Sequence, residues 1–203
     1  MIYYHNTYMK KGQLILFIGP TCVGKTTLIA ALRKEYFPNS GLIVSYTTRP
    51  PRTEMGERDG VGYYFISEEE FLQMEARGEF YESVRRPTGY YASSQKQVHE
   101  LLDAHPIVFG DLDVEGAKVV KGMEPDSLMV FLYPDDIADL GVRLRARPIK
   151  EPEEKIQGRL KAAEEEMEHK DDFDVALLNE DGKFEETVEK MLQILKERGV
   201  ERE

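Results

Sequence analysis

Almost continuous apolar runs alternate with segments of helical periodicity along most of the chain. Such runs, unlike the alternating pattern of half-exposed strands, are typical of strands covered on both faces. The runs are QLILFIG (13–19), GLIVSY (41–46), PIVFGDLD (106–113), SLMVFLY (127–133) and DVALLN (174–179). We expect each to be a buried strand, and the helical segments between them predict an α/β fold with a parallel central sheet covered on both sides.

Between the runs, apolar residues recur every three or four positions, which predicts amphipathic helices. Ser67 and Glu70 form a capping box at the start of one of them. We expect helices over 25–36, from 67 to 78, from 94 to 104, up to 119, up to 145, over 151–169 and over 183–199.

The stretch 47–93 breaks this alternation. It holds a strand candidate at 62–67 and two short tyrosine-rich candidates, 79–86 and 89–94, which are close enough for a hairpin. We therefore expect a small, mostly β lobe inserted into the α/β fold. The whole is predicted to be a single domain over 9–203, with residues 1–8 as a loose N-terminal extension.

The hydrophobic content, net charge and cysteine count limit the classes of function that the sequence is compatible with. The chain of 203 residues is 41% hydrophobic and 32% charged, as expected of a globular protein. Its net charge of −11 argues against a nucleic-acid partner, so an anionic ligand must be held by local arginine clusters. No apolar stretch is long enough to span a membrane, and the single cysteine excludes an internal disulfide. We expect a cytoplasmic protein; nothing in the sequence indicates its oligomeric state.

The segment GPTCVGKT (19–26) matches G-x-x-x-x-G-K-[ST] between a predicted strand and helix. Glycines let backbone amides face phosphate oxygens, the lysine reaches the terminal phosphates and the threonine hydroxyl suits Mg²⁺. The alternative is a glycine turn with a surface lysine. We expect nucleoside triphosphate binding by Gly19, Pro20, Thr21, Cys22, Val23, Gly24, Lys25, Thr26 and Thr27. DVEG (113–116) has D-x-x-G spacing, but the absence of N-K-x-D argues against a GTPase.

SYTTRPPR (45–52) holds two arginines around a pair of prolines. Arginine forks bind a doubly charged phosphate by two points, and the prolines reduce the entropy lost when the loop closes on it. A solvated surface turn is the alternative. The pattern favours an anion clamp made by Arg49 and Arg52.

This segment, followed by GERDGVGYYF, EFYES, TGYYASS and DLDVEG, resembles guanylate kinase from about Gln13 to Lys196. The resemblance implies transfer of the γ-phosphate of ATP to GMP with Mg²⁺. It also implies that Arg49 and Arg52 bind the GMP phosphate together with Tyr63 and Tyr91, although either tyrosine taken alone is as readily explained by core packing.

The same resemblance assigns a guanine pocket. Glu82 would accept from the N1–H and N2–H₂ of guanine, Asp113 would add to the N2 side, and Ser45 and Ser93 would face O6. Asp111, at the end of an apolar run, would hold the metal with Thr26; a cap for the next helix is the alternative.

The resemblance also implies a helical lid over about 141–169, leaving a core of 9–46, 94–140 and 170–203, with the nucleoside monophosphate lobe over about 47–93. Among the lid arginines, Arg147 and Arg159 best match those that close over the triphosphate. They complete a catalytic set with Lys25 and Arg49, and Asn179 matches an adenine-side position. Here the chain reads RPIKEP (147–152) where the family has R-G-T-E. No general base is required, because the attacking phosphate oxygen is already ionised.

Two other functions compete with this interpretation. One is a non-catalytic phosphopeptide-binding module of the same fold, which typically lacks the phosphate-loop lysine, whereas Lys25 is present. The other is a kinase for a different nucleoside monophosphate, against which Glu82 and Ser45 argue.

Overall fold

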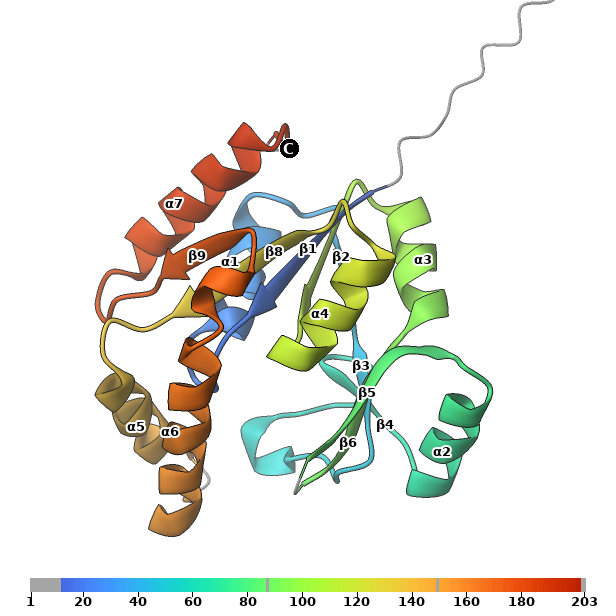
Figure 1. Cartoon of the computed structure of the whole chain (residues 1–203), viewed down its shortest axis with the longest axis horizontal. Helices are drawn as coiled ribbons and strands as arrows, with labels where there is room; N and C mark the ends of the chain where they lie inside the picture. Colours follow the sequence, from blue (N-terminus) through green and yellow to red (C-terminus); the bar gives the residue numbers. More distant parts are fainter. Residues whose placement is uncertain (1–11, 87, 149, 202–203) are drawn as a thin grey trace, which may run out of the picture.

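A five-stranded parallel sheet runs through the centre of the protein (Figure 1). The computed structural model describes residues 12–86, 88–148 and 150–201, so the predicted extension over 1–8 and the start at residue 9 lie outside the described residues. The strands follow the order β2-β7-β1-β8-β9. They are β1 (Gln13–Ile18), β2 (Gly41–Leu42), β7 (Ile107–Asp111), β8 (Leu128–Tyr133) and β9 (Val175–Leu178).

Helices cover both faces of this sheet. Alternate residues of β1 therefore pack into two separate cores, one on each face. Ile15 and Phe17 pack with residues of α1 (Lys25–Glu35) and α7 (Phe184–Glu197). Leu14 and Leu16 pack with residues of α3 (Gln95–Ala104) and α4 (Val114–Met123) on the opposite face. The predicted three-layer α/β architecture is confirmed.

A second, four-stranded sheet is built from the stretch that interrupts the alternation. Its order is β4-β3-β6-β5, with β3 and β4 parallel and the other pairs antiparallel. Phe71 and Met74 of α2 (Glu68–Ala76) pack with Phe80 and Ala92 of this sheet to form a small core of its own. The strands are β3 (Ser45–Thr47), β4 (Tyr63–Phe65), β5 (Phe80–Arg86) and β6 (Gly89–Ser94).

The segment GLIVSY is not one strand, contrary to the prediction. The Ile43 amide still donates to the Phe109 carbonyl at 2.8 Å, but the Val44 amide donates to the side chain of Gln97 at 2.9 Å. The chain thus leaves the central sheet after Leu42 and enters the smaller sheet at Ser45. Both sheets accept apolar residues here, so the apolar run alone does not reveal the change of sheet.

The remaining helices lie close to their predicted positions. Ser67 accepts from the Glu70 amide at 3.1 Å, and Ser94 from the Gln97 amide at 3.4 Å, as expected for N-caps. The helix expected to end at Val119 continues to Met123. Two helices complete the lid segment, α5 (Ile137–Ala146) and α6 (Glu153–Met167), and two short 3₁₀ turns, η1 (Thr53–Met55) and η2 (Lys170–Asp172), were not predicted. Over the described ranges, no helix combines the length and apolarity needed to cross a membrane.

Candidate functional site

The predicted phosphate loop joins β1 to α1 and depends on its two glycines. Gly19 has φ +129°, and a Cβ there would lie 2.1 Å from the Leu132 carbonyl oxygen. Gly24 has φ +108°, and a Cβ there would lie 2.6 Å from Nδ2 of Asn179. Both positions therefore exclude any side chain, on grounds of backbone conformation and of space.

Within the loop, Cys22 adopts φ +63°, a left-handed conformation that is uncommon and costly outside glycine. The Lys25 ammonium folds back over the loop and donates to the carbonyls of Gly19 and Pro20, the latter at 3.2 Å. Thr26 and Thr27, in the first turn of α1, are exposed. The lysine thus lies where a bound phosphate would replace the carbonyls as its partner.

Two side chains from the C-terminal third of the sequence donate hydrogen bonds to the carbonyls of the loop. Asn179 is 5% exposed; its Nδ2 donates to the Val23 carbonyl at 2.7 Å, and its Oδ1 accepts from Thr187 at 3.0 Å. Arg143 donates to the carbonyls of Cys22 and Val23 at 3.3 and 3.4 Å. The sequence did not predict this support of the loop by Asn179.

The Arg49 side chain is buried in the smaller sheet rather than exposed on a surface turn. Arg49 is 6% exposed, with its guanidinium 4.9 Å from the Tyr63 ring centroid and 5.4 Å from that of Phe65. Its two terminal nitrogens donate to the two carboxylate oxygens of Glu57, both at 2.7 Å. The same carboxylate accepts from the Arg52 amide at 2.7 Å, so Glu57 links both arginines of the predicted clamp.

Glu57 was missed from the sequence as a site residue, although it lies in the quoted GERDG. It follows Gly56, whose φ of +72° turns the loop back on itself. Burial raises the pKa of Glu57, but the hydrogen bonds from Arg49 and from the Arg52 amide more than offset this and hold it below its ordinary value. Among the described residues, Nε and one Nη2 hydrogen of Arg49 have no partner, so this edge of the guanidinium keeps two donors.

The tyrosines of the predicted clamp lie beside Arg49. The rings of Tyr63 and Tyr91 meet edge to face at 5.9 Å, and the Tyr91 hydroxyl is 2.9 Å from that of Thr88. Burial raises the pKa of Tyr63 to about 12, and the negative charge of Asp111 acts in the same direction. The Tyr63 hydroxyl therefore stays protonated and can donate to an anion.

Asp111 occupies the carboxyl end of β7, beside the strand that leads into the phosphate loop. It is in register with Phe17, and the next amide, that of Leu112, donates to the Phe17 carbonyl at 3.0 Å. The helix-cap alternative for Asp111 is wrong, because Asp113 caps α4 by accepting from the Gly116 amide at 2.8 Å.

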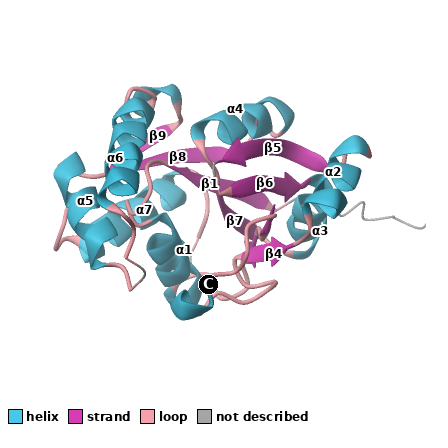
Figure 2. Cartoon of the chain, turned by 90° about the horizontal axis from the view of Figure 1, so that it is seen from below, coloured by secondary structure: helices cyan, strands magenta, loops and turns pink. Residues whose placement is uncertain are grey.

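The residues predicted to bind guanine come mainly from β5, β6 and the N-cap of α4, and Figure 2 shows these elements as neighbours. Glu82 pairs with Ser93 across the hairpin, and a Cβ on Gly116 would lie 3.1 Å from the Glu82 side chain. Asp113 is also hydrogen-bonded to Arg86. Ser45, in β3, is half-buried and in register with Tyr63.

Burial raises the pKa of Glu82 to about 7; the charge of Asp113 adds to this, while the Ser93 hydroxyl and amide and the Arg86 charge act against it. Ser93 Oγ is itself buried and has no partner at normal hydrogen-bond length among the described residues. Glu82 and Ser93 thus place a buried carboxylate beside a buried hydroxyl, groups that can accept from and donate to a polar base.

Of the two lid arginines predicted to act on the triphosphate, Arg159 is held by Glu151 through Nε at 2.7 Å and Nη2 at 3.0 Å. Arg147 caps the end of α5 and is half-buried. An outer pair, Arg145 with Glu153, lies on the exposed side of the same segment.

Electrostatic contacts join the phosphate-loop side to the smaller sheet. Glu166 of α6 lies within reach of the charges of Lys25, Arg86 and Asp113; burial raises its pKa, and the two cations act against the rise. The charge of Asp111 likewise reaches Tyr63 of the smaller sheet.

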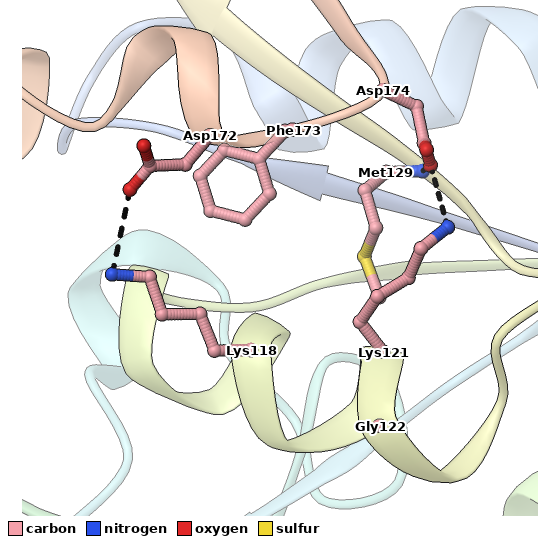
Figure 3. Close-up of a pocket in the computed structure, with 7 residues that line it drawn as sticks. All are labelled: Lys118, Lys121, Gly122, Met129, Asp172, Phe173 and Asp174. Atoms are coloured by element: carbon pink, nitrogen blue, oxygen red, sulfur yellow. Dashed lines mark hydrogen bonds and ion pairs between the residues drawn. The ribbon is translucent and has the colours of Figure 1, made fainter.

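A different pocket of about 260 Å³ lies apart from this space (Figure 3). Lys118 and Lys121 of α4 pair there with Asp172 and Asp174, over Met129 and Phe173. None of the predicted site residues lines it.

Among the predicted site residues, few side chains are placed to supply oxygen ligands to a hard cation such as Mg²⁺. Over the described ranges, no group of three or more His, Cys, Asp or Glu residues is arranged to hold a metal ion. The exposed Thr26 hydroxyl and the exposed Asp111 carboxylate fit a magnesium ion that takes its other ligands from phosphate and water.

Comparison with known proteins gives one consistent result. The family model described as guanylate kinase matches residues 11–198. The chain is 36% identical over 170 residues to a guanylate kinase of Nostoc sp., covering 84% of this chain and 83% of that protein. It is 39% identical over 184 residues to one of Prochlorococcus marinus, covering 91% and 97%. The crystal structure of guanylate kinase from Anaplasma phagocytophilum is similar with a TM-score of 0.71 and 25% identity, covering 93% and 87%.

Replacing Glu57 by Gln should lower the free energy of unfolding at neutral pH by about 1 to 2 kcal/mol, because a buried guanidinium loses its two-point partner, which is itself partly exposed. The lowered pKa means that the contribution of Glu57 is present above the ordinary value of 4.5 and is lost as pH falls through the folded-state pKa. Urea unfolding of the wild type and of Glu57→Gln, from neutral pH to below pH 4.5, measures this contribution. Glu54→Gln, at an exposed position in the same loop, is the control; an equal loss in both variants would contradict the assignment.

Proposed function

The chain belongs to the guanylate kinase family and is an ATP:GMP phosphotransferase, and we propose that its two substrates occupy the two groups of residues described above. ATP would bind the phosphate loop, and GMP would bind the smaller sheet. The observation that supports this most directly is the buried Arg49, which Glu57 holds and which keeps two N–H donors without a partner among the described residues, in a protein that also keeps an intact Lys25 loop.

On the ATP side, the amides of the loop from Gly19 to Thr26 and the positive end of α1 would bind the β- and γ-phosphates. Lys25 would exchange the carbonyls of Gly19 and Pro20 for phosphate oxygens. Arg147 and Arg159 would bind the transferring group from the lid, and Asn179 would contact the adenine side. A magnesium ion, held by Thr26 and Asp111, would neutralise charge on the phosphates.

On the GMP side, the free edge of Arg49 and the side chain of Arg52 would bind the phosphate, with donated hydrogen bonds from Tyr63 and Tyr91. The raised pKa of Tyr63 supports this, because a neutral hydroxyl donates to an anion without repelling it. The attacking oxygen belongs to this phosphate and is already ionised, so the chain supplies position and positive charge rather than a base.

The guanine ring would lie against Glu82, Ser93, Ser45 and Asp113. An ionised Glu82 accepts from N1–H and N2–H₂ together, which adenine does not offer. Adenine would therefore leave a buried carboxylate unmatched, the kind of mismatch that produces large discrimination. The phosphopeptide-binding alternative does not account for an intact phosphate loop with Lys25 and Thr26.

The proposal is tested by following ADP release with ATP and each of GMP, AMP, UMP and CMP. GMP should be preferred by about a hundredfold or more in kcat/KM, because only guanine satisfies Glu82. Preference for another monophosphate would overturn the assignment of the base pocket. No turnover with any of them, together with binding of a phosphopeptide, would favour the non-catalytic module.

Replacing Lys25 by Ala should abolish phosphoryl transfer and leave the affinity for GMP nearly unchanged, because the lysine serves only the triphosphate side. Steady-state turnover and calorimetric GMP titration measure the two effects. Lys34→Ala, an exposed lysine at the end of the same helix, is the matched control. A collapse of GMP binding in Lys25→Ala would mean that the two sites are not separate.

Affinity for guanosine should depend on the ionisation of Glu82. Its pKa of about 7 in the unliganded protein means that guanosine binding, which needs the ionised form, weakens below pH 7 by up to about tenfold per pH unit and levels off above it. Guanosine is the probe because the GMP phosphate titrates near pH 6 by itself. Calorimetric titration with guanosine across pH should show this loss of affinity below pH 7 for the wild type and an affinity independent of pH for Glu82→Gln. The same pH dependence in both proteins would mean that Glu82 does not bind the base.

A further inference from the structure

Glu151 is a carboxylate among the arginines of the phosphate site, with no role assigned so far. It lies in RPIKEP, where the chain differs from the family pattern, directly before the proline that caps α6. Its side chain is 17% exposed and that of Arg159 is 29% exposed. The pair joins Nε and Nη2 of Arg159 to the two carboxylate oxygens at 2.7 and 3.0 Å.

The charges around Glu151 come from three separate parts of the chain. Its pKa is lowered first by the hydrogen bonds of Arg159 and, beyond the charge of that residue, by the charges of Arg147 and Arg52, while burial acts against them. Arg159 is in α6, Arg147 ends α5, and Arg52 belongs to the loop of the smaller sheet. One carboxylate therefore lies within electrostatic reach of arginines predicted to bind the phosphates of both substrates.

Glu151 leaves most of the Arg159 guanidinium available. The two-point contact takes Nε–H and one hydrogen on Nη2, and the other three N–H groups have no partner among the described residues. A phosphate can bind this remaining face without displacing Glu151.

Without such a support, the three arginines would repel one another in the absence of nucleotide. A free arginine side chain also loses rotamer entropy when it is ordered by a ligand. A two-point ion pair removes much of this loss in advance.

We infer that Glu151 is a positioning residue for phosphoryl transfer: it fixes Arg159 and compensates the charge that Arg159, Arg147 and Arg52 bring to one space. This inference rests on the proposed roles of these arginines. It does not depend on which base the GMP pocket selects.

The lid segment contains its own control. Arg145 and Glu153 are also eight residues apart and hydrogen-bonded, but their side chains are 46% and 58% exposed. Solvent and salt weaken such a pair, so its removal should not affect the site. Glu153→Gln and Glu151→Gln change the same chemical group two positions apart.

The experiment compares the wild type, Glu151→Gln, Glu151→Asp and Glu153→Gln in ATP and GMP titrations of turnover, with calorimetric GMP binding in the absence of ATP. Glu151→Gln should lower kcat/KM for ATP roughly tenfold through loss of preorganisation, and should change the GMP dissociation constant less than about threefold. Glu151→Asp should recover part of the loss, and Glu153→Gln should match the wild type.

Three outcomes would overturn the inference. Unchanged kcat/KM in Glu151→Gln would mean that the ion pair has no role in the reaction. A lower KM for ATP would mean that Glu151 competes with phosphate. Equal loss of ATP use, of GMP binding and of melting temperature would indicate a structural role only. A wild type inactive on GMP would instead contradict the proposed function, so the two failures are distinguishable.

Discussion

Two phosphate groups that repel each other must be brought together in a protein that is itself strongly acidic. With a net charge of −11, the molecule as a whole does not attract such ligands, so positive charge has to be concentrated locally. Four arginines are each paired with a carboxylate: Arg49 with Glu57, Arg159 with Glu151, Arg86 with Asp113 and Arg143 with Asp181. In the two less exposed pairs, Arg49 with Glu57 and Arg159 with Glu151, a two-point contact orients the guanidinium and leaves some of its N–H groups for a ligand.

The phosphate loop is also held by hydrogen bonds, which in this case go to its backbone carbonyls. Its conformation requires glycine at two positions and places Cys22 in a strained left-handed backbone conformation. Such strain persists only where surrounding contacts impose it. Asn179 and Arg143 supply those contacts through the loop carbonyls, which leaves the amides on the other side for phosphate. The end of β9 and helix α5 are thereby tied to the loop between β1 and α1.

Much of this arrangement could be predicted from sequence, for identifiable reasons. Buried strands of a parallel sheet are continuously apolar, and the glycine-lysine loop has few alternatives once it lies between a strand and a helix. The failures share a cause, because each depends on which specific side chain bonds which group in the folded chain, and hydrophobic periodicity does not report that. GLIVSY is divided by Gln97, the residue that caps α4 is chosen by local geometry, and Glu57 and Glu151 gain their significance from arginines that the sequence does not pair with them. The distances between the predicted site residues likewise depend on how the two sheets pack.

The division at Ile43 and Val44 has a mechanical consequence. The smaller sheet is connected to the rest of the chain at only two points, there and at the entry to α3, and Gln97 joins the two by bonding the Val44 amide. Because Gln97 lies in the first turn of α3, the two crossings lie side by side at one joint, and the packing of α4 against β5 is a further contact between the smaller sheet and the rest of the chain. The position of Arg49 relative to the phosphate loop therefore depends on this joint and on that packing together.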